Sequence, residues 1–235
     1  MFTNTKGLAI PQGTVTKIEK DGVVLWSIAE ESFEDVYQQV EWIQADTDVG
    51  AYLDLGFAFD TGAVMEYSQY ITDTQNTYVF GSAENSGKLR CMITSPYYIA
   101  SKYNCYFYGS SGSAYISATC TYKLNAWNYY TYTLEKGNLN SYNSTTDYTA
   151  SKTTQGSYTM TNNLYLFAQN YNGTARFGGA RRIGYFKYYD SSGVLICDLV
   201  PCYRKSDGVI GMYDLVRETF LTNVGSGTFT KGADV

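Results

Sequence analysis

The side chains that could do chemistry in this chain are carboxylates and aromatic rings, because the sequence contains no histidine. Without an imidazole there is no Ser–His or Cys–His nucleophile, and the usual metal ligand is missing. No Gly-rich phosphate loop or dinucleotide fingerprint occurs. A glycoside hydrolase needs two carboxyl groups on one face, but Glu41 and Glu66 stand alone among the predicted strand residues. We therefore expect no catalytic residue, and hydrolysis is the less favoured alternative.

Metal binding is not indicated by the acidic residues or the cysteines. The spacing of the aspartates in predicted loops matches no dedicated calcium loop, and Asx-turn chemistry explains them, so we expect no cofactor and leave calcium open. The cysteines are odd in number and show no CxxC spacing, so buried free thiols are expected, although a bridge from Cys91 to Cys105 or Cys120 stays open. The loop aspartates are Asp46, Asp48, Asp60, Asp190, Asp207 and Asp214, and the cysteines are Cys91, Cys105, Cys120, Cys197 and Cys202.

Aromatic side chains are the positive signal, since the chain has 25 Tyr, 11 Phe and 3 Trp. Tyr and Trp rings stack on the apolar faces of sugars and hydrogen-bond through their polar tips. They gather in the segment from Ser95 to Tyr132, and they could equally pack against one another or form a homo-oligomer interface. The candidate contacts with a glycan or a partner protein are Tyr97, Tyr98, Tyr103, Trp127, Tyr129, Tyr130 and Tyr132.

Charge and hydropathy exclude two classes of partner. The net charge is -5 and the basic residues are scattered, so we expect no nucleic-acid binding. No apolar segment is long enough to span a bilayer, and the first residues lack the basic and apolar blocks of a signal peptide. We expect no membrane insertion.

The elements that must position these residues are short strands, because Tyr, Thr, Ser and Gly are frequent and helix-forming runs are absent. Residues 1–30 form a small module, with strands predicted at Thr14–Lys20 and Val23–Ser27 around the hairpin turn Asp21–Gly22. Residues 31–35 form a linker or one helical turn, and residues 36–235 form the main domain. A lone hairpin is marginal in water, so its apolar residues should dock onto something. These anchor residues are Ile10, Val15, Ile18, Val24 and Trp26.

The end of the chain predicts two hairpins. Strands at 183–189 and 194–200 flank the turn Asp190–Gly193, and a turn at Lys205–Gly208 leads to a further strand at 209–213. Pro201 should end the second strand because it has no N–H. The apolar run around Asp198 predicts a central strand, in which that carboxylate ties down a turn or meets Arg181, Arg182 or Arg204. The polar stretch 138–155 predicts a long surface loop or a ragged edge strand.

This C-terminal pattern resembles the end of laminin-G-like, concanavalin A-like jelly-roll domains, which recur in tail and other virion proteins of phages and prophages of gut bacteria. The resemblance implies an antiparallel jelly-roll β-sandwich preceded by the hairpin module. It rests on the segments Asp198–Cys202, Arg204–Asp214, Val40–Gln44 with Ala51–Gly56 as an opening strand pair, and Asn163–Ala168 with Asn172–Thr174.

The function that follows is a non-enzymatic virion protein of a bacteriophage, in the tail tip, fibre or head decoration, assembled in the cytoplasm of its host. Its N-terminus would attach to other virion proteins, and its sandwich would contact a bacterial surface glycan or protein, or neighbouring subunits. A homo-oligomer, for instance a trimer, fits this role, although no heptad pattern establishes it. The alternative is a secreted or surface glycan-binding protein of a gut bacterium.

Overall fold

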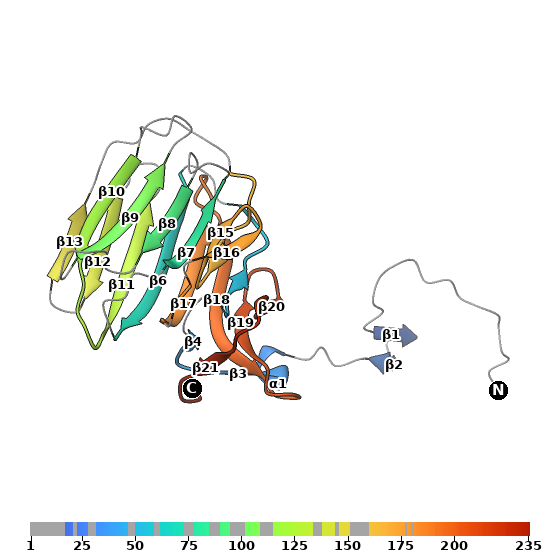
Figure 1. Ribbon diagram of the computed structural model, residues 1–235. Helices are drawn as coiled ribbons and strands as arrows, with labels where there is room; N and C mark the ends of the chain where they lie inside the picture. The colour runs from blue at the N-terminus through green and yellow to red at the C-terminus, as the bar shows by residue number, and fades with distance from the viewer. Residues whose placement is uncertain are drawn as a thin grey trace. The chain divides into compact units, whose positions relative to one another are not determined.

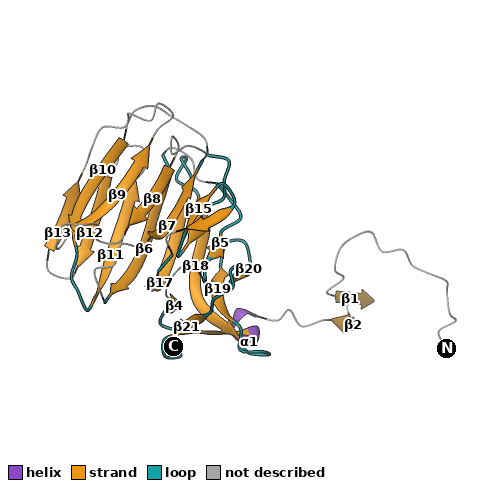
Figure 2. Ribbon diagram, viewed as in Figure 1, coloured by secondary structure: helices purple, strands orange, loops and turns teal. Residues whose placement is uncertain are grey.

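The structure is a computed structural model that describes residues 17–20, 23–27, 32–46, 50–58, 62–72, 78–84, 90–94, 102–108, 115–133, 138–143, 146–150, 160–176, 178–179 and 181–235. Side chains are described in residues 32–46, 50–58, 62–72, 78–84, 122–132, 160–176, 178–179 and 181–235. The chain divides into two compact units, Met1–Val36 and Tyr37–Val235. Strands predominate among the described residues, as Figure 2 shows.

The first unit contains the predicted hairpin and one turn of helix. Strand β1 (Lys17–Lys20) pairs antiparallel with β2 (Val23–Ser27), which confirms the two strands around Asp21–Gly22, and Ile18 faces Trp26 in the register. Helix α1 (Phe33–Val36) follows. The backbone N–H and the hydroxyl of Ser32 both donate to Asp35 Oδ2, at 3.0 and 2.9 Å, so the Asp35 carboxylate reaches back to the residue before the helix, as the acidic side chain of a capping box does.

The second unit is built from two sheets, whose orders can be followed in Figure 1. Its strands pair antiparallel, except that β15 runs parallel to β7. The larger sheet has the order β13 (Thr146–Ala150), β12 (Asn138–Asn143), β11 (Ala126–Thr133), β6 (Val64–Ile71), β17 (Arg182–Tyr189), β18 (Leu195–Arg204), β19 (Ile210–Asp214) and β20 (Thr219–Thr222), with β3 (Tyr37–Gln39), β4 (Ile43–Ala45) and β21 (Phe229–Lys231) at one end. The smaller sheet has the order β10 (Tyr115–Thr121), β9 (Lys102–Tyr108), β8 (Arg90–Thr94), β7 (Tyr78–Ala83), β14 (Tyr165–Leu166) and β5 (Leu53–Asp54). In addition, β15 (Gln169–Tyr171) pairs with β7, and β16 (Thr174–Arg176) pairs with β15.

The inner faces of the two sheets form one apolar core. Tyr67 of β6 meets Phe80 of β7 edge to face, with ring centroids 5.4 Å apart, and Phe80 meets Phe186 of β17 at 5.6 Å. All three side chains are fully buried. Strands distant in sequence lie side by side, as β6 does between β11 and β17. The predicted all-β, antiparallel jelly-roll sandwich with an N-terminal hairpin is confirmed.

The predicted C-terminal hairpins are also confirmed, because their turns are held by local hydrogen bonds. Asp190 Oδ1 accepts the backbone N–H groups of Ser192 and Val194, both at 2.9 Å, and Gly193 has φ +84°. The second turn closes β18 onto β19 with Gly208 at φ +72°. Strand β18 lies between β17 and β19, as predicted for a central strand.

Pro201 does not end its strand, so that prediction is wrong. Strand β18 continues to Arg204, and Pro201 pairs with Met212 of β19. The Pro201 carbonyl accepts the N–H of Val40 at 2.9 Å, on the edge of β18 where the partner changes from β17 to β3. In an antiparallel sheet the N–H and C=O of one residue point to the same neighbouring strand. The N–H that Pro201 lacks would therefore point to the side where β17 gives way to β3. No hydrogen bond between β18 and β19 is lost.

Two further segments differ from the sequence-based predictions. Much of the stretch 138–155 forms a hairpin of two strands, β12 and β13, so the alternative of a long loop is wrong for this part, whereas the alternative of an edge strand agrees with β13 at the edge of the larger sheet. The opening segments 40–44 and 51–56 contribute β4 and β5 to different sheets and do not pair with each other. In both cases the structure of the segment depends on the strand with which it pairs. The residues of the segment alone do not specify that partner.

Candidate functional site: an aromatic face on the larger sheet

The outer face of the larger sheet carries an aromatic surface at its centre. Side chains alternate along β11, β6 and β17, so that Tyr130, Tyr67 and Phe186 enter the core and their sequence neighbours face away from it. We call the outward set the outer aromatic face. It comprises Tyr70, Trp127, Tyr129, Tyr185 and Tyr189, together with the charged residues Glu66, Lys187 and Asp198.

The strand register places the charged residues in one row across three strands. Glu66 of β6 pairs with Lys187 of β17, and Lys187 pairs with Asp198 of β18. Lys187 Nζ lies 3.0 Å from Asp198 Oδ2. The hydrogen bond to Asp198 raises the pKa of Lys187, with burial opposing the shift and Glu66 adding to it. Lys187 is therefore a fully charged ammonium between two carboxylates at neutral pH.

A row of rings lies beside this charged row. Tyr129 of β11 and Tyr185 of β17 both pair with Ser68 of β6, so the two rings flank a small residue. Tyr129 is 43% exposed, whereas Tyr185 is half-buried. Burial raises the pKa of Tyr185, and Glu66, Tyr129 and Tyr189 raise it further. The Tyr185 phenol therefore keeps its proton at neutral pH and can donate a hydrogen bond.

The Trp127 ring packs over Gly184, which has no side chain and so leaves space for the ring on the outer face of the sheet. A Cβ atom on Gly184 would lie 2.7 Å from Ser68 Oγ and 3.2 Å from the nearest Trp127 ring atom. The register between β17 and β6 shifts at this glycine. The indole also meets Tyr70 edge to face, with centroids 5.6 Å apart. Gly184 thus lets the Trp127 ring approach the backbone of the sheet.

A stacked arginine extends the aromatic face toward β4. The guanidinium carbon of Arg182 lies 4.4 Å from the Trp42 ring centroid and 5.3 Å from that of Tyr70. Arg182 Nε donates to Gln44 Oε1 at 3.0 Å. Cation–π contacts and this hydrogen bond hold the two rings in place.

Four of the seven predicted contact residues have described side chains, and two of these four lie on this face. Trp127 and Tyr129 lie there, but Tyr130 and Tyr132 are buried in the core, with exposures of 1% and 0%, so their assignment to a contact surface is wrong. Successive residues of a strand point to opposite faces of the sheet. Tyr130 and Tyr132 therefore point into the core, while Trp127 and Tyr129 of the same strand point outward. Tyr97 and Tyr98 lie outside the described residues, and Tyr103 belongs to β9, whose side chains are not described.

Sequence reasoning missed Tyr70, Tyr185 and Tyr189. The alternation of β17, in which Phe186 and Tyr188 are buried, was visible in the sequence and could have identified Tyr185 and Tyr189 as a face. The pairing of β17 with β6 could not have been identified from the sequence, because Tyr70 and Tyr185 are more than a hundred positions apart. The partner of Asp198 was also missed, since it is Lys187 and none of the three predicted arginines.

The loop aspartates that are described serve turns and ion pairs. Asp190 and Asp207 accept backbone N–H groups of their own turns, and Asp46 Oδ2 accepts the N–H of Thr228 at 3.0 Å. Asp48 and Asp60 lie outside the described residues. Within the described ranges no group of three or more Cys, Asp or Glu side chains gathers that could hold a metal ion.

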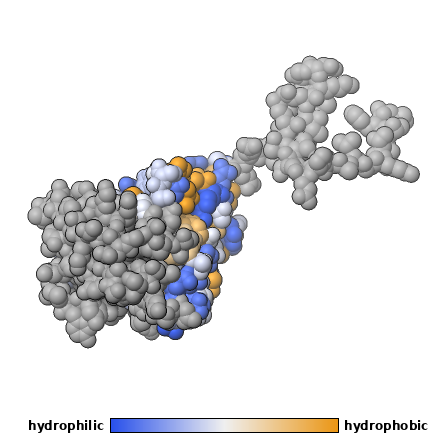
Figure 3. Space-filling view, turned by 90° about the horizontal axis from the view of Figure 1, so that it is seen from above, coloured by the Kyte–Doolittle hydropathy of each residue, from blue (hydrophilic) through white to orange (hydrophobic). Residues whose placement is uncertain are grey.

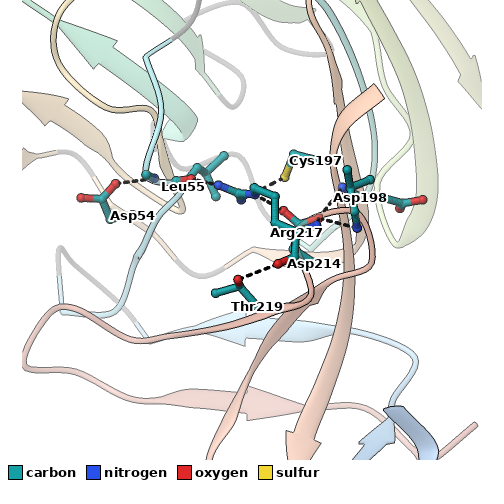
Figure 4. A network of polar contacts seen from close by, with 9 residues as sticks. Asp54, Leu55, Cys197, Asp198, Asp214, Arg217 and Thr219 are labelled. Carbon is teal, nitrogen blue, oxygen red and sulfur yellow. Dashed lines mark hydrogen bonds and ion pairs between the residues drawn. The ribbon is translucent and has the colours of Figure 1, made fainter. Parts of the chain in front are cut away.

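Asp214 belongs to a polar network that joins the two sheets (Figure 4). Its carboxylate is fully buried and accepts the N–H of Asp198 at 3.1 Å and that of Val216 at 2.9 Å, as well as Nε of Arg217. Arg217 Nη1 then donates to the carbonyl of Leu55, just after β5, at 2.6 Å. This network explains Asp214 as a structural residue.

Two cysteines are described, and both are buried free thiols, as predicted. Burial raises the pKa of the Cys202 thiol to about 12 and raises that of Cys197 further. The side chains of Cys91, Cys105 and Cys120 lie outside the description, so the alternative of a bridge among them stays a prediction.

No helix among the described residues is long and apolar enough to cross a bilayer. On the side seen in Figure 3, hydrophobic residues are interspersed with hydrophilic ones over the described surface.

Comparisons with known proteins find similarity in structure alone. No protein-family model and no curated protein matches the sequence of this chain. Domains LG4-5 of the mouse laminin alpha1 chain align with a TM-score of 0.45 and 13% identity, covering 71% of this chain and 44% of the laminin fragment. This chain therefore spans less than half the length of that fragment.

Two other solved structures align at similar levels. A heptameric SAP-like pentraxin of Limulus polyphemus has a TM-score of 0.45 and 10% identity, covering 65% of this chain and 76% of its own. A protein of Bacteroides ovatus, described as a proposed carbohydrate-binding protein, has a TM-score of 0.46 and 10% identity, covering 84% of this chain and 62% of its own. At these values the likenesses carry no argument about function, which has to come from the outer aromatic face.

Proposed function

We propose that this protein is a non-enzymatic glycan-binding module that holds carbohydrate against the outer aromatic face. The observation that carries the proposal is the clustering of Trp127, Tyr129 and Tyr185 beside a row of three charged side chains on one side of a rigid sheet. Rings bind the C–H faces of a sugar, and charged groups beside them bind its hydroxyls.

The rigidity of the platform supports this function. Trp127 lies against Gly184, and Tyr185 is half-buried among its neighbours, so little side-chain freedom remains to be lost on binding. Backbone pairing on both sides of β6 and β17 holds the strands that carry these rings. A sheet keeps such contacts in more precise positions than a loop does.

The test is a glycan-array screen of the full chain, followed by calorimetric titration with each polysaccharide that binds. Tyr129→Ala should weaken binding at least tenfold, because truncating a central aromatic contact costs roughly 1 to 2 kcal/mol or more. The matched control is Tyr171→Ala, which removes a half-buried tyrosine of β15 in the smaller sheet that stacks under Arg176 at 3.8 Å. Binding to no glycan, or an equal loss in both variants, would contradict the proposal.

The cellular context remains a prediction from the sequence. We predict that residues 1–30 attach the chain to other proteins of a phage or prophage particle, and that the sandwich presents its aromatic face to the bacterial surface. The side chains of the anchor residues Ile10, Val15, Ile18, Val24 and Trp26 lie outside the description. Secretion or surface display by a bacterium is the alternative. If the hairpin is an anchor, a chain beginning at Val36 should keep its glycan affinity and lose any self-association or binding to particles.

A hydrolase is the second candidate, favoured by a single observation. Glu66 and Asp198 lie on the same face with one strand between them, which puts their backbones roughly 10 Å apart. Inverting glycosidases separate their carboxyl groups by roughly 6.5 to 9.5 Å. However, Asp198 is held by Lys187. Release of reducing ends from a bound polysaccharide, abolished by Glu66→Gln, would establish this reading against the binding-only proposal.

A further inference from the structure

We infer that the outer aromatic face selects neutral glycans and rejects anionic ones, and that the row Glu66–Lys187–Asp198 makes this selection. The inference rests on the proposed function, because it names the ligand class of the same site. It follows from the charges that the sheet register places beside the rings, and from the ion pair that already engages Lys187 with Asp198.

The first argument is the charge balance of the row. Two carboxylates flank one ammonium, which leaves a formal charge of -1 beside Tyr129 and Tyr185. Lys187 Nζ already contacts Asp198 Oδ2 at 3.0 Å, so its positive charge is compensated before any ligand arrives. An anionic sugar placed on the rings would meet Glu66 without a free cation beside it. The chain as a whole carries -5, which adds repulsion at longer range.

The second argument concerns the nearest arginine of the face. Arg182 contacts the rings of Trp42 and Tyr70 and donates through Nε to Gln44, so two ring contacts and one hydrogen bond already hold its guanidinium. It also pairs with Tyr70, two residues along β6 from Ser68, so its row lies roughly 7 Å from the row of Tyr129 and Tyr185, on the side opposite Glu66. Arginine forks that bind carboxylate or sulfate present two free N–H groups to the ligand. Arg182 therefore cannot offer its Nε edge to an acidic sugar held at Tyr129 and Tyr185, and Glu66 repels such a sugar from the other side.

The third argument is what the row offers to a neutral sugar. Ionised carboxylates accept hydrogen bonds from hydroxyl groups, and such charge-assisted bonds are roughly twice as strong as neutral ones. The Tyr185 phenol and the remaining ammonium hydrogens of Lys187 are donors on the same face. A neutral pyranose, whose hydroxyls both donate and accept, can satisfy both kinds of group. A carboxylate or sulfate ester only accepts.

The experiment is native affinity electrophoresis of the full chain through gels that contain polysaccharides with the same backbone and different charge. Hydroxyethylcellulose is compared with carboxymethylcellulose, and dextran with dextran sulfate. A neutral arabinogalactan and polygalacturonate extend the panel to other backbones. We expect the neutral member of at least one pair to retard the protein, with an apparent affinity at least tenfold higher than that of its anionic partner. Raising the salt from 50 to 500 mM should narrow this ratio, because salt screens the repulsion at a partly exposed site.

Glu66→Gln tests the row itself, because it removes one negative charge and keeps the shape of the side chain. It should narrow the ratio of neutral to anionic affinity at least threefold. The control is Glu218→Gln, which changes the net charge equally at an exposed position in the turn between β19 and β20. That variant should keep the wild-type ratio.

The outcomes separate the inference from the proposed function. Anionic polymers that retard the protein as strongly as their neutral partners would overturn the inference and leave glycan binding standing. An unchanged ratio in Glu66→Gln, or an equal change in Glu218→Gln, would also overturn it. If no polysaccharide retards the protein and the glycan array is blank, the proposed function fails, and the inference fails with it.

Discussion

The strongest prediction from this structure concerns Asp214, which should be the most costly carboxylate to neutralise among those described. Its side chain is fully buried, accepts two backbone N–H groups at 3.1 and 2.9 Å, and pairs with Arg217, which reaches the carbonyl of Leu55 near the other sheet. Asp214→Asn keeps the shape but turns an acceptor into a donor facing Arg217 Nε. Breaking a buried ion pair costs about 3 to 5 kcal/mol. The Arg217 side chain is 31% exposed, so we reduce the expected loss to about 2 to 3 kcal/mol.

The pH dependence follows from the pKa of Asp214. Burial by itself raises this pKa, but hydrogen bonds from the Asp198 N–H, the Arg217 side chain and the Val216 N–H outweigh it, and the net pKa is lowered. A carboxylate with a lowered folded pKa stabilises the fold fully above its unfolded pKa of about 3.9, and this stabilisation is lost as the pH falls through the folded value. The gap in unfolding free energy between wild type and Asp214→Asn should therefore be complete at pH 7 and pH 5, and narrow below about pH 4.

Urea denaturation followed by tryptophan fluorescence measures this gap. Asp207→Asn is the matched control, because Asp207 forms an exposed ion pair with Arg204 and the variant changes the net charge equally. Its urea midpoint should stay at the wild-type value. A double-mutant cycle with Arg217→Met should give a coupling of about 1 to 2 kcal/mol. A cost below about 0.5 kcal/mol for Asp214→Asn, or a gap that does not narrow in acid, would refute this account of the network.

Two further predictions concern the packing of the larger sheet. Gly184→Ala should lower the unfolding free energy by about 1 to 2 kcal/mol and shift the tryptophan emission, since the new Cβ would lie 2.7 Å from Ser68 Oγ and 3.2 Å from the Trp127 ring. Adding Ser68→Ala should recover part of the loss, and an unchanged Gly184→Ala variant would show that Trp127 does not rest there. The Cys202 thiol, buried and with a pKa raised to about 12, should resist iodoacetamide at pH 8 in the folded protein and react in urea, as mass spectrometry would show. Fast alkylation of the folded protein at Cys202 would contradict the burial of this strand.

Local features of the fold could be predicted because their causes are local. The turn Asp190–Gly193 is held by its own aspartate and by a glycine with positive φ, and the hairpin of β1 and β2 surrounds an Asp–Gly pair. The helical turn α1 in the first unit is closed by hydrogen bonds from Ser32 to Asp35, both at its start. Each of these depends on residues within four positions of one another.

The predictions that failed depend on neighbours far along the chain. Pro201 stays within β18 because the partner of that strand changes from β17 to β3 at its carbonyl. Tyr130 and Tyr132 were predicted on the surface, yet their parity on β11 turns them into the core. The position of a proline and the alternation of residues along a strand are visible in the sequence. Which edge of the strand lacks a partner, and which face of it is buried, are not.

The sequence by itself determined the all-β class, the hairpin turns, the lack of imidazole chemistry and the abundance of rings, since composition and short spacing carry these properties. Only the tertiary structure decided which rings share a face and which charges stand beside them. Glu66, Lys187 and Asp198 form a row because β6, β17 and β18 are laterally paired, and Trp127 joins them because Gly184 leaves room under its ring. Lateral pairing is set by burial of the opposite face against the smaller sheet, a property of the whole sandwich, so no single segment could have shown it.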